Sequence, residues 1–216
     1  MTQMLPAISI ASYVSAFAAS PLAAFGALAP WALAARAESI VRELLAALPA
    51  GEFMRSEEIA IHPTATVEPG AILKGPLILG PGCFVAAGAY LRGGNWVAAN
   101  CALGPGVELK SSFVFSGATL AHFNFVGDSL LGEGVNLEAG SILCNCRNER
   151  PNKEINVRLG VEFHGTDTEK FGALIGDRCR IGANTVLAPG TLLPPNTIVG
   201  RMELLDQELL AGREGG

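Results

Sequence analysis

Three basic side chains, Lys74, Arg92 and Lys110, recur at an interval of eighteen residues, and each directly follows a leucine. In a chain that closes one coil every eighteen residues, they stack on one face with backbones about 4.8 Å apart. Like charges held so close repel each other, so the alignment favours an anion site over a merely solvated face. For Arg92 and Lys110 we predict phosphate binding, because Arg gives bidentate recognition and Lys adds a point charge. Lys74 taken alone fits a solvated surface nearly as well.

His122 is the residue type that can act as a general base near neutral pH. It is one of three histidines in the chain, and a regular repeat changes its spacing beside it. An irregular stretch of a regular repeat favours a functional histidine over a structural one. His62 is expected near the bottom of the stack, far from His122, so three histidines cannot converge on one metal ion. We therefore expect no metal site, and we interpret His62 and His164 as structural.

A repeat of six residues must position these side chains. From Ile61, every sixth residue is apolar for eleven successive positions, which end at Phe115 and Ala121. Small residues follow many of these positions, and Gly and Pro supply turns. A period of six is typical of hexapeptide β-helices, in which three units close one triangular coil. The repeat predicts a mainly β protein with a parallel β-helix of about six coils.

The repeat is interrupted twice. Ten residues separate Ala121 from Leu131, where two full units would need twelve. Between Asn145 and Leu174 the pattern vanishes into a polar, charged stretch. A loop of that length in a solenoid is usually functional or forms oligomer contacts.

The sequence divides into four expected segments. They are an apolar helical N-terminal segment (1–29), an amphipathic helix with a linker (30–56), the β-helix (57–201) with an inserted loop (146–174), and a short C-terminal helix with a tail (202–216). In the second segment Leu33, Ile40, Leu44 and Leu45 can share one helix face. Over the whole stretch before Arg36 no charged residue occurs, but Pro6, Pro21 and Pro30 interrupt the apolar run. We expect it to pack on the protein rather than anchor it in a membrane.

Composition narrows the class of protein. The 216 residues are 50% hydrophobic and 16% charged, with a net charge of -5. This balance predicts one sizeable domain and argues against a general partner of nucleic acids or anionic membranes. The five cysteines show no metal-ligand spacing, so we expect reduced thiols in a cytoplasmic protein.

Specific segments add a family resemblance. The repeats resemble the left-handed β-helix acyltransferases, and the chain from about Pro30 to Val199 is similar to the C-terminal acetyltransferase domain of bifunctional sugar-1-phosphate nucleotidyltransferases. The segments that carry this resemblance are "AYLRGG", "GPGVELKSS", "AHFNFVGDS", "GVNLEAG" and "FGALIGDRCRIGANTVLAPG". The resemblance implies a left-handed coil, acetyl-CoA or another acyl-CoA as co-substrate, and a homotrimer with sites between subunits.

The resemblance also implies roles for single residues. His122 would take a proton from the acceptor's amino group, while Arg92 and Lys110 would hold the acceptor's phosphate. Asn136 and Asn145 match family residues that lie near the acetyl group and the amino sugar. Lys153 matches a lysine in the loop of the archaeal members. For the two asparagines, turn chemistry is an equally good interpretation.

Three departures from the family pattern shape the prediction. Phe125 stands where the family has a tyrosine, Cys146 stands where the bacterial enzymes have another, and only about fifty residues precede the repeat. We therefore expect no nucleotidyltransferase domain. The leading hypothesis is an acyl-CoA-dependent acyltransferase that N-acetylates an amino-sugar phosphate or a nucleotide-linked sugar. The alternative is a catalytically weak binding protein or subunit of the same fold that recognises the same sugars.

Overall fold

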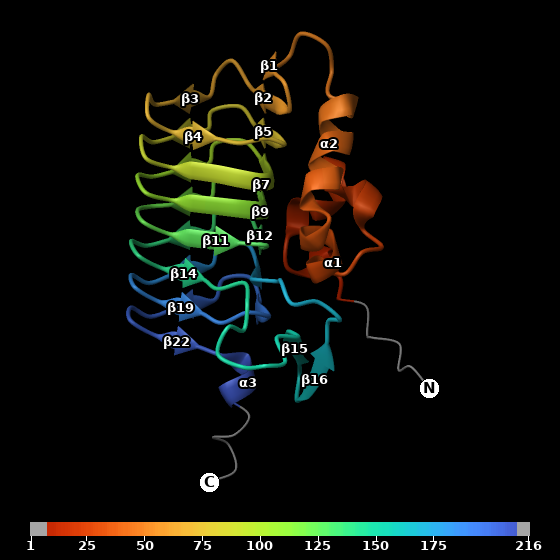
Figure 1. Ribbon diagram of the computed structural model, residues 1–216, viewed down its shortest axis with the longest axis vertical. Coiled ribbons are helices and arrows are strands. Elements are labelled where there is room, and N and C mark those ends of the chain that lie inside the picture. Colours follow the sequence, from red (N-terminus) through yellow and green to blue (C-terminus); the bar gives the residue numbers. More distant parts are fainter. Residues whose placement is uncertain (1–7, 211–216) are drawn as a thin grey trace.

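The computed structural model describes residues 8–210, and its main body is a stack of short parallel strands (Figure 1). Seven strands lie on each of three faces in these residues. The solenoid is therefore mainly β, as predicted, and has about one coil more than expected. The difference arises because the repeat continues past Val199 to Leu205, which pairs with Leu187.

We name the three faces by what lies on them. The basic face holds β4 (Ile72–Leu73), the first part of β7 (Tyr90–Val97), the first part of β9 (Glu108–Val114), β11 (Phe125–Gly127), β14 (Ile142–Leu143), β19 (Val186–Leu187) and β22 (Leu204–Leu205). The helix-covered face holds β2 (Ile59–Ile61), β5 (Leu77–Leu79), the ends of β7 and β9, β12 (Leu130–Leu131), β17 (Ala173–Ile175) and β20 (Thr191–Leu193). The open face holds β3 (Thr66–Val67), β6 (Phe84–Val85), β8 (Ala102–Leu103), β10 (Thr119–Leu120), β13 (Asn136–Leu137), β18 (Arg180–Ile181) and β21 (Ile198–Val199). At the start of the stack, β1 (Met54–Ser56) pairs antiparallel with β2.

The interior of the stack is a column of fully buried aliphatic side chains. Most of the predicted positions, such as Leu91, Leu103 and Leu109, belong to it. The predicted positions Phe115 and Ala121 are wrong, because Val114 and Leu120 point inward instead. Phe115 lies outside the coil, where its ring contacts Trp96.

The inward-facing positions move by one residue because of a change at the corner between the basic and helix-covered faces. The pairing register between β7 and β9 shifts by one residue here. Two residues, Gly93 and Gly94, form the corner in the coil of β7, whereas Ser111 alone forms it in the next coil. Asp128 takes the same position one coil further on. Ser111 and Asp128 both have left-handed backbones, with φ of 49° and 48°. Each makes a tighter corner, so these two coils are one residue shorter than the eighteen expected.

Helices cover one face of the stack. The predicted helix from Pro30 is split into α1 (Pro30–Ala35) and α2 (Ala37–Ala47), which meet at Arg36. Before them, the chain forms the 3-10 helices η1 (Ile10–Ser12), η2 (Ser15–Ala19) and η3 (Pro21–Phe25). Residues 1–7 of the predicted apolar segment lie outside the described part. No helix within residues 8–210 combines the length and apolarity needed to cross a membrane.

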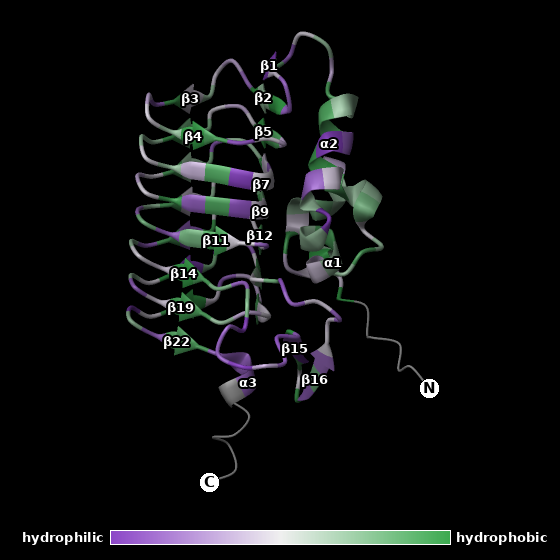
Figure 2. Ribbon diagram, in the orientation of Figure 1, coloured by the Kyte–Doolittle hydropathy of each residue, from purple (hydrophilic) through white to green (hydrophobic). Residues whose placement is uncertain are grey.

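A second hydrophobic core fills the space between these helices and the solenoid. Trp31 and Ile40 of the helices pack with outward-facing side chains of the strands, including Trp96 and Phe113. Figure 2 shows hydrophilic residues at the ends of β7 and β9 that approach α2. Hydrophobic burial therefore docks α2 beside the polar corner of the coils.

The inserted segment leaves and rejoins the stack between Leu143 and Ile175. It forms an antiparallel hairpin of β15 (Asn156–Leu159) and β16 (Glu162–Gly165). Arg147 donates to both oxygens of Asp206 at 2.6 and 2.9 Å, next to α3 (Gln207–Leu210). Arg147 is buried, so this ion pair holds the start of the insertion against the end of the chain.

Candidate functional site

The predicted cation column exists, and it ends at the corner where the coils are shortened. We call this the basic corner: residues 92–95, 110–112, 127–129 and 144–145. Arg92 is paired in register with Lys110, and Lys110 with Gly127. Lys74 follows Leu73, which pairs with Leu91 one coil away. The eighteen-residue spacing therefore correctly predicts that the three cations stack.

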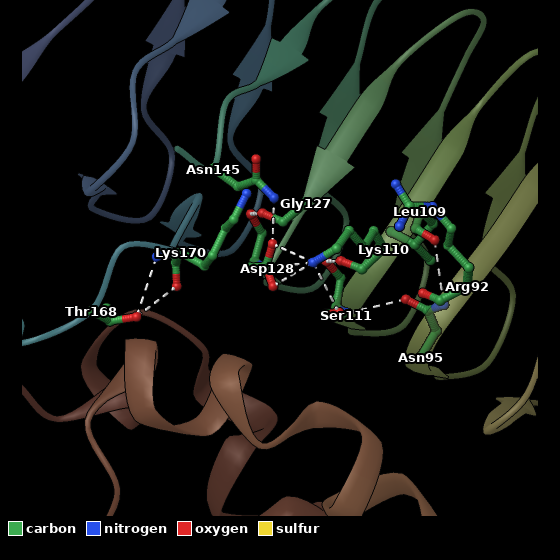
Figure 3. Close-up of polar contacts among 12 residues, drawn as sticks. Arg92, Asn95, Leu109, Lys110, Ser111, Gly127, Asp128, Asn145, Thr168 and Lys170 are labelled. Atoms are coloured by element: carbon green, nitrogen blue, oxygen red, sulfur yellow. Dashed lines mark hydrogen bonds and ion pairs between the residues drawn. The ribbon is translucent and has the colours of Figure 1, made fainter. Parts of the chain in front are cut away.

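The column is not a row of unpaired charges. Arg92 donates from Nε and Nη2 to Oε1 of Glu108 at 2.8 and 2.6 Å. The ring of Tyr90 lies between two cations, 5.7 Å from the Arg92 guanidinium carbon and 5.2 Å from Lys74 Nζ. Lys110 Nζ donates to both carboxylate oxygens of Asp128 at 2.9 Å (Figure 3). Carboxylates and an aromatic ring thus offset the repulsion that the sequence implies.

Asp128 is the site residue that sequence reasoning missed. Its side chain is buried, and it accepts a hydrogen bond from Asn145 Nδ2 in addition to the bonds from Lys110. A buried carboxylate requires such partners, so Asp128 joins Lys110 and Asn145 into one cluster. The available signal was the shortened coil, since a polar non-glycine residue is well suited to a tight left-handed corner.

A ladder of buried polar side chains holds this corner together. Asn95 Oδ1 accepts from the backbone nitrogen of Ser112, and Ser112 Oγ accepts from that of Ser129. Ser129 Oγ in turn accepts from the backbone nitrogen of Ala173, where the insertion returns. Each coil therefore satisfies the backbone of the next, and the cation column has a rigid base.

Phe125 approaches the same cluster from the middle of the basic face. A Cβ atom built on Gly127 would lie 2.6 Å from Asn145 Nδ2 and 2.8 Å from Phe125 Cζ. Only glycine leaves room for both groups. The far end of the Phe125 ring, where a tyrosine would carry its hydroxyl, therefore lies near the Asn145 amide.

Cys144 continues the outward column one coil beyond Gly127, because Leu143 is paired with Val126. Burial, with a smaller effect from Glu149, raises the pKa of the Cys144 thiol. The thiol is therefore protonated at neutral pH and does not supply a thiolate nucleophile to the site.

His122 lies at the opposite end of the basic face, at the corner with the open face. Its side chain is exposed and has no hydrogen-bond or ion-pair partner within residues 8–210. The next residue, Phe123, has a φ of 51° and is 69% exposed. The same turn position is a left-handed glycine in four other coils, at Gly70, Gly88, Gly106 and Gly140, and a left-handed Asn184 or Met202 in the last two. A bulky residue there is strained, and such strain is common at functional sites.

A buried amide holds this strained turn. Asn124 is 2% exposed, and its Nδ2 donates to Glu138 O at 2.8 Å, Ser141 Oγ at 2.8 Å and Ser141 O at 3.2 Å. The backbone carbonyl of His122 accepts from Gly140 N at 2.9 Å. The next coil thus fixes the backbone of His122 and leaves its imidazole exposed.

The structure brings some predicted site residues together and leaves others apart. Five residues separate His122 from Gly127, a span of at most about 17 Å along the strand direction. Lys74, Arg92, Lys110 and Asn145 gather at the far end of that span. Asn136 lies on the open face, where it pairs with Thr119 and Arg180. Lys153 precedes the hairpin, and no hydrogen bond or ion pair links it to the basic corner in the described part of the chain.

No family model matches the chain. The "Bifunctional protein GlmU" of Carboxydothermus hydrogenoformans is 24% identical over 207 residues, which is 81% of this chain and 42% of the relative. The "Bifunctional sugar-1-phosphate nucleotidylyltransferase/acetyltransferase" of Sulfurisphaera tokodaii is 31% identical over 133 residues, 62% of this chain and 33% of the relative. These relatives confirm the resemblance to the bifunctional sugar-1-phosphate enzymes, and the chain spans less than half their length.

Solved structures of hexapeptide transferases are also similar. One is a hexapeptide transferase family protein from Anaplasma phagocytophilum, with a TM-score of 0.33 and 17% identity, covering 72% of this chain and 86% of that protein. Another is the acetyltransferase domain of PglB from Neisseria gonorrhoeae, with a TM-score of 0.25 and 20% identity, covering 83% of this chain and 65% of that domain.

Proposed function

We propose that this relative of the GlmU-type proteins is an acyl-CoA-dependent N-acyltransferase. Its acceptor is an amino-sugar phosphate or a nucleotide-linked amino sugar. The observation that carries the proposal is the layout of the basic face. An exposed histidine that has no partner among the described residues lies at one end, and stacked Arg92 and Lys110 lie at the other. The Sulfurisphaera tokodaii relative is named as a nucleotidylyltransferase/acetyltransferase, which supports the same reaction class.

The proposed reaction uses the histidine at one end of the basic face and the cations at the other. The Nε2 or Nδ1 atom of His122 accepts a proton from the acceptor's amino group as its nitrogen attacks the thioester carbonyl carbon. The new C–N bond forms, the C–S bond breaks, and the departing coenzyme A sulfur receives the proton from the imidazolium. The products are an N-acyl sugar and free coenzyme A. No metal ion is needed to balance this reaction, and acyl-CoA is its only co-substrate.

Arg92 can take the acceptor's phosphate without losing its carboxylate partner. Both of its bonds go to one oxygen of Glu108, from Nε and Nη2, and Nη1 has no partner within the described residues. The pair is about one-third exposed, so Arg92 is accessible to ligand. Glu108 then orients the guanidinium, and Nη1 is the donor that remains for a phosphate oxygen.

We further propose a cytoplasmic homotrimer in which a second subunit approaches the corner at His122. The exposed ring of Phe123 at this corner is the surface that motivates the assignment. A subunit placed there would exclude water from the thioester, which strengthens the interactions of the reacting groups. Light scattering at micromolar concentration tests the assembly, and a monomer would refute it.

Thiol release from acetyl-CoA, measured with a panel of amino-sugar phosphates and nucleotide-linked amino sugars, tests the activity. We expect release with at least one acceptor and none without an acceptor. A well-folded protein that releases no thiol with any member of the panel contradicts the proposed function.

A catalytically weak binding protein is the second candidate, and Phe125 is the observation that favours it. Its ring end lies beside Asn145, where a tyrosine hydroxyl would provide a donor that this chain lacks. Calorimetric binding of an amino-sugar phosphate with no thiol release would support this candidate over the enzyme. Restored release in Phe125→Tyr would identify the missing hydroxyl as the reason.

A further inference from the structure

A cleft of ≈ 610 Å³ lies between the helices and the basic corner. We call it the helix cleft. Three separate segments line it: the α1–α2 junction with Arg42, the coil residues Gly93, Lys110, Ser111 and Asp128, and the insertion residues Thr168 and Lys170. Its volume is within the usual range of small-molecule sites. Lys110 belongs both to this cleft and to the cation column, so the cleft opens directly beside the proposed acceptor site.

A pair of glycines lets the helices approach the coil at this point. Gly93 and Gly94 have φ of 75° and 88°. A Cβ atom on Gly94 would lie 2.6 Å from the backbone nitrogen of Glu38, and one on Gly93 would lie 2.7 Å from Ser111 Oγ. The start of α2 therefore rests on bare backbone. This contact places Arg36, at the junction of α1 and α2, on the rim of the same cleft as Lys110.

The charges that line the cleft are mostly positive. Four cations, Arg36, Arg42, Lys110 and Lys170, face two carboxylates, Glu38 and Asp128. Both carboxylates already have cationic partners, since Lys110 pairs with Asp128 at 2.9 Å and Arg42 pairs with Glu38 at 3.4 Å. Arg42 also pairs with Glu58, which does not line the cleft, at 2.5 Å. The whole chain, in contrast, has a net charge of -5. A local excess of positive charge in an acidic protein marks a site for an anion.

Arg36 and Lys170 differ from the other two cations of the cleft. Neither Arg36 nor Lys170 forms an ion pair within residues 8–210. The side chain of Lys170 extends toward Asn145 and Gly127, beside the Lys110–Asp128 pair (Figure 3). Two cations that line one cleft from different segments of the chain can bind one anion, and Arg36 can do so with two parallel hydrogen bonds.

We propose that the helix cleft is a second anion site that binds a diphosphate group. The proposal deepens the proposed function, because a ligand in the cleft reaches the cation column through Lys110. A diphosphate occurs both in a nucleotide-linked acceptor and in coenzyme A, and the two sources have the same chemistry at Arg36 and Lys170. The site itself does not depend on catalysis.

Calorimetry with inorganic pyrophosphate at fixed ionic strength tests the site. We expect Arg36→Gln/Lys170→Gln to weaken pyrophosphate binding about tenfold or more, since each charge-assisted hydrogen bond contributes measurably. The matched control is Arg55→Gln/Arg178→Gln, which removes the same charge away from the cleft and should change the affinity less than about twofold by general electrostatics. Equal weakening in the two double variants, or no binding by the parent, overturns the proposal.

Two further titrations identify the source of the diphosphate. Lost affinity for UDP in the Arg36→Gln/Lys170→Gln variant, with unchanged affinity for coenzyme A, assigns the cleft to the acceptor. The reverse result assigns it to the acyl donor, and unchanged affinity for both contradicts the proposal. His122→Ala should bind pyrophosphate like the parent. A parent that shows cleft-dependent binding but no acyl transfer would refute the proposed function and leave the anion site standing.

Discussion

The two ends of the basic face are built from the same repeat and differ in what covers them. At the basic corner, α2 and the insertion lie over the coils, and Arg92 and Lys110 are both held by carboxylates. At the corner of His122 no helix of the described chain covers the turn, and His122 and Phe123 are exposed. The covered end has its charges oriented in advance, whereas the side chain at the uncovered end has no partner within residues 8–210. The function proposed above places binding and proton transfer at different ends of one surface.

The two ends also tolerate backbone strain in different ways. Asp128 is left-handed, and its own side chain bonds to Lys110 and Asn145. Phe123 is left-handed as well, but its ring is exposed and the buried Asn124 beneath it secures the turn. Strain is thus offset by ionic side chains at one corner and by a buried amide at the other. Four substitutions test whether the two ends of the basic face differ in this way.

The largest effect is expected at the uncovered end. We predict that His122→Ala lowers the rate of acyl transfer about a hundred- to ten-thousand-fold, which is typical for loss of a general base. The side chain is exposed, so the thermal midpoint should not change. The control is His164→Ala, which removes a histidine on β16 outside the basic face. A folded His122→Ala protein with near-normal turnover would reject the proposed role.

At the covered end, we predict that Asp128→Ala reduces the free energy of unfolding by about 2–3 kcal/mol. The substitution leaves Lys110 and Asn145 without their partner, and the cost is moderated because Lys110 is partly exposed. Urea unfolding measures the change. Asp128→Asn keeps an acceptor and tolerates the left-handed backbone, so its loss should be smaller. If both variants are as stable as the parent, the cluster does not stabilise the corner.

Arg92→Ala should weaken acceptor binding about tenfold and leave acyl-CoA binding unchanged, because a charge-assisted bond to the phosphate is lost. Calorimetry at fixed salt gives both affinities. Lys74→Ala, at the exposed end of the column, is the comparison and should have a smaller effect. Equal acceptor affinity in Arg92→Ala and the parent would show that the column is only surface.

The smallest effect concerns the strained turn. We predict that Phe123→Gly raises the free energy of unfolding by about 1 kcal/mol, because glycine adopts a left-handed backbone without strain. The same variant should lose acyl-transfer activity if the ring contacts a ligand or a second subunit. Gly140→Ala places a side chain in the equivalent turn of the next coil and should be destabilising. A destabilised Phe123→Gly would mean that the ring packs usefully within the subunit.

Much of the architecture could be predicted because it depends on local repetition. The aliphatic residue at every sixth position identifies the coil, and the spacing of Arg92 and Lys110 identifies their alignment. The error at Phe115 shows the limit of that reasoning. Val114 and Phe115 are both apolar, so periodicity cannot tell which one points inward when a corner uses one residue fewer.

The sequence by itself determined the solenoid and the stacking of the cations, since both follow from the number of residues per coil. Only the tertiary structure decided which cations are paired, because the partners of the column come from other coils. Lys110 meets Asp128 from the next coil, whereas Arg36 of the helices and Lys170 of the insertion line the same cleft and pair with no carboxylate of residues 8–210. Charge pairing depends on a few ångströms of separation, and that distance is set by how α2 and the insertion pack against the coils.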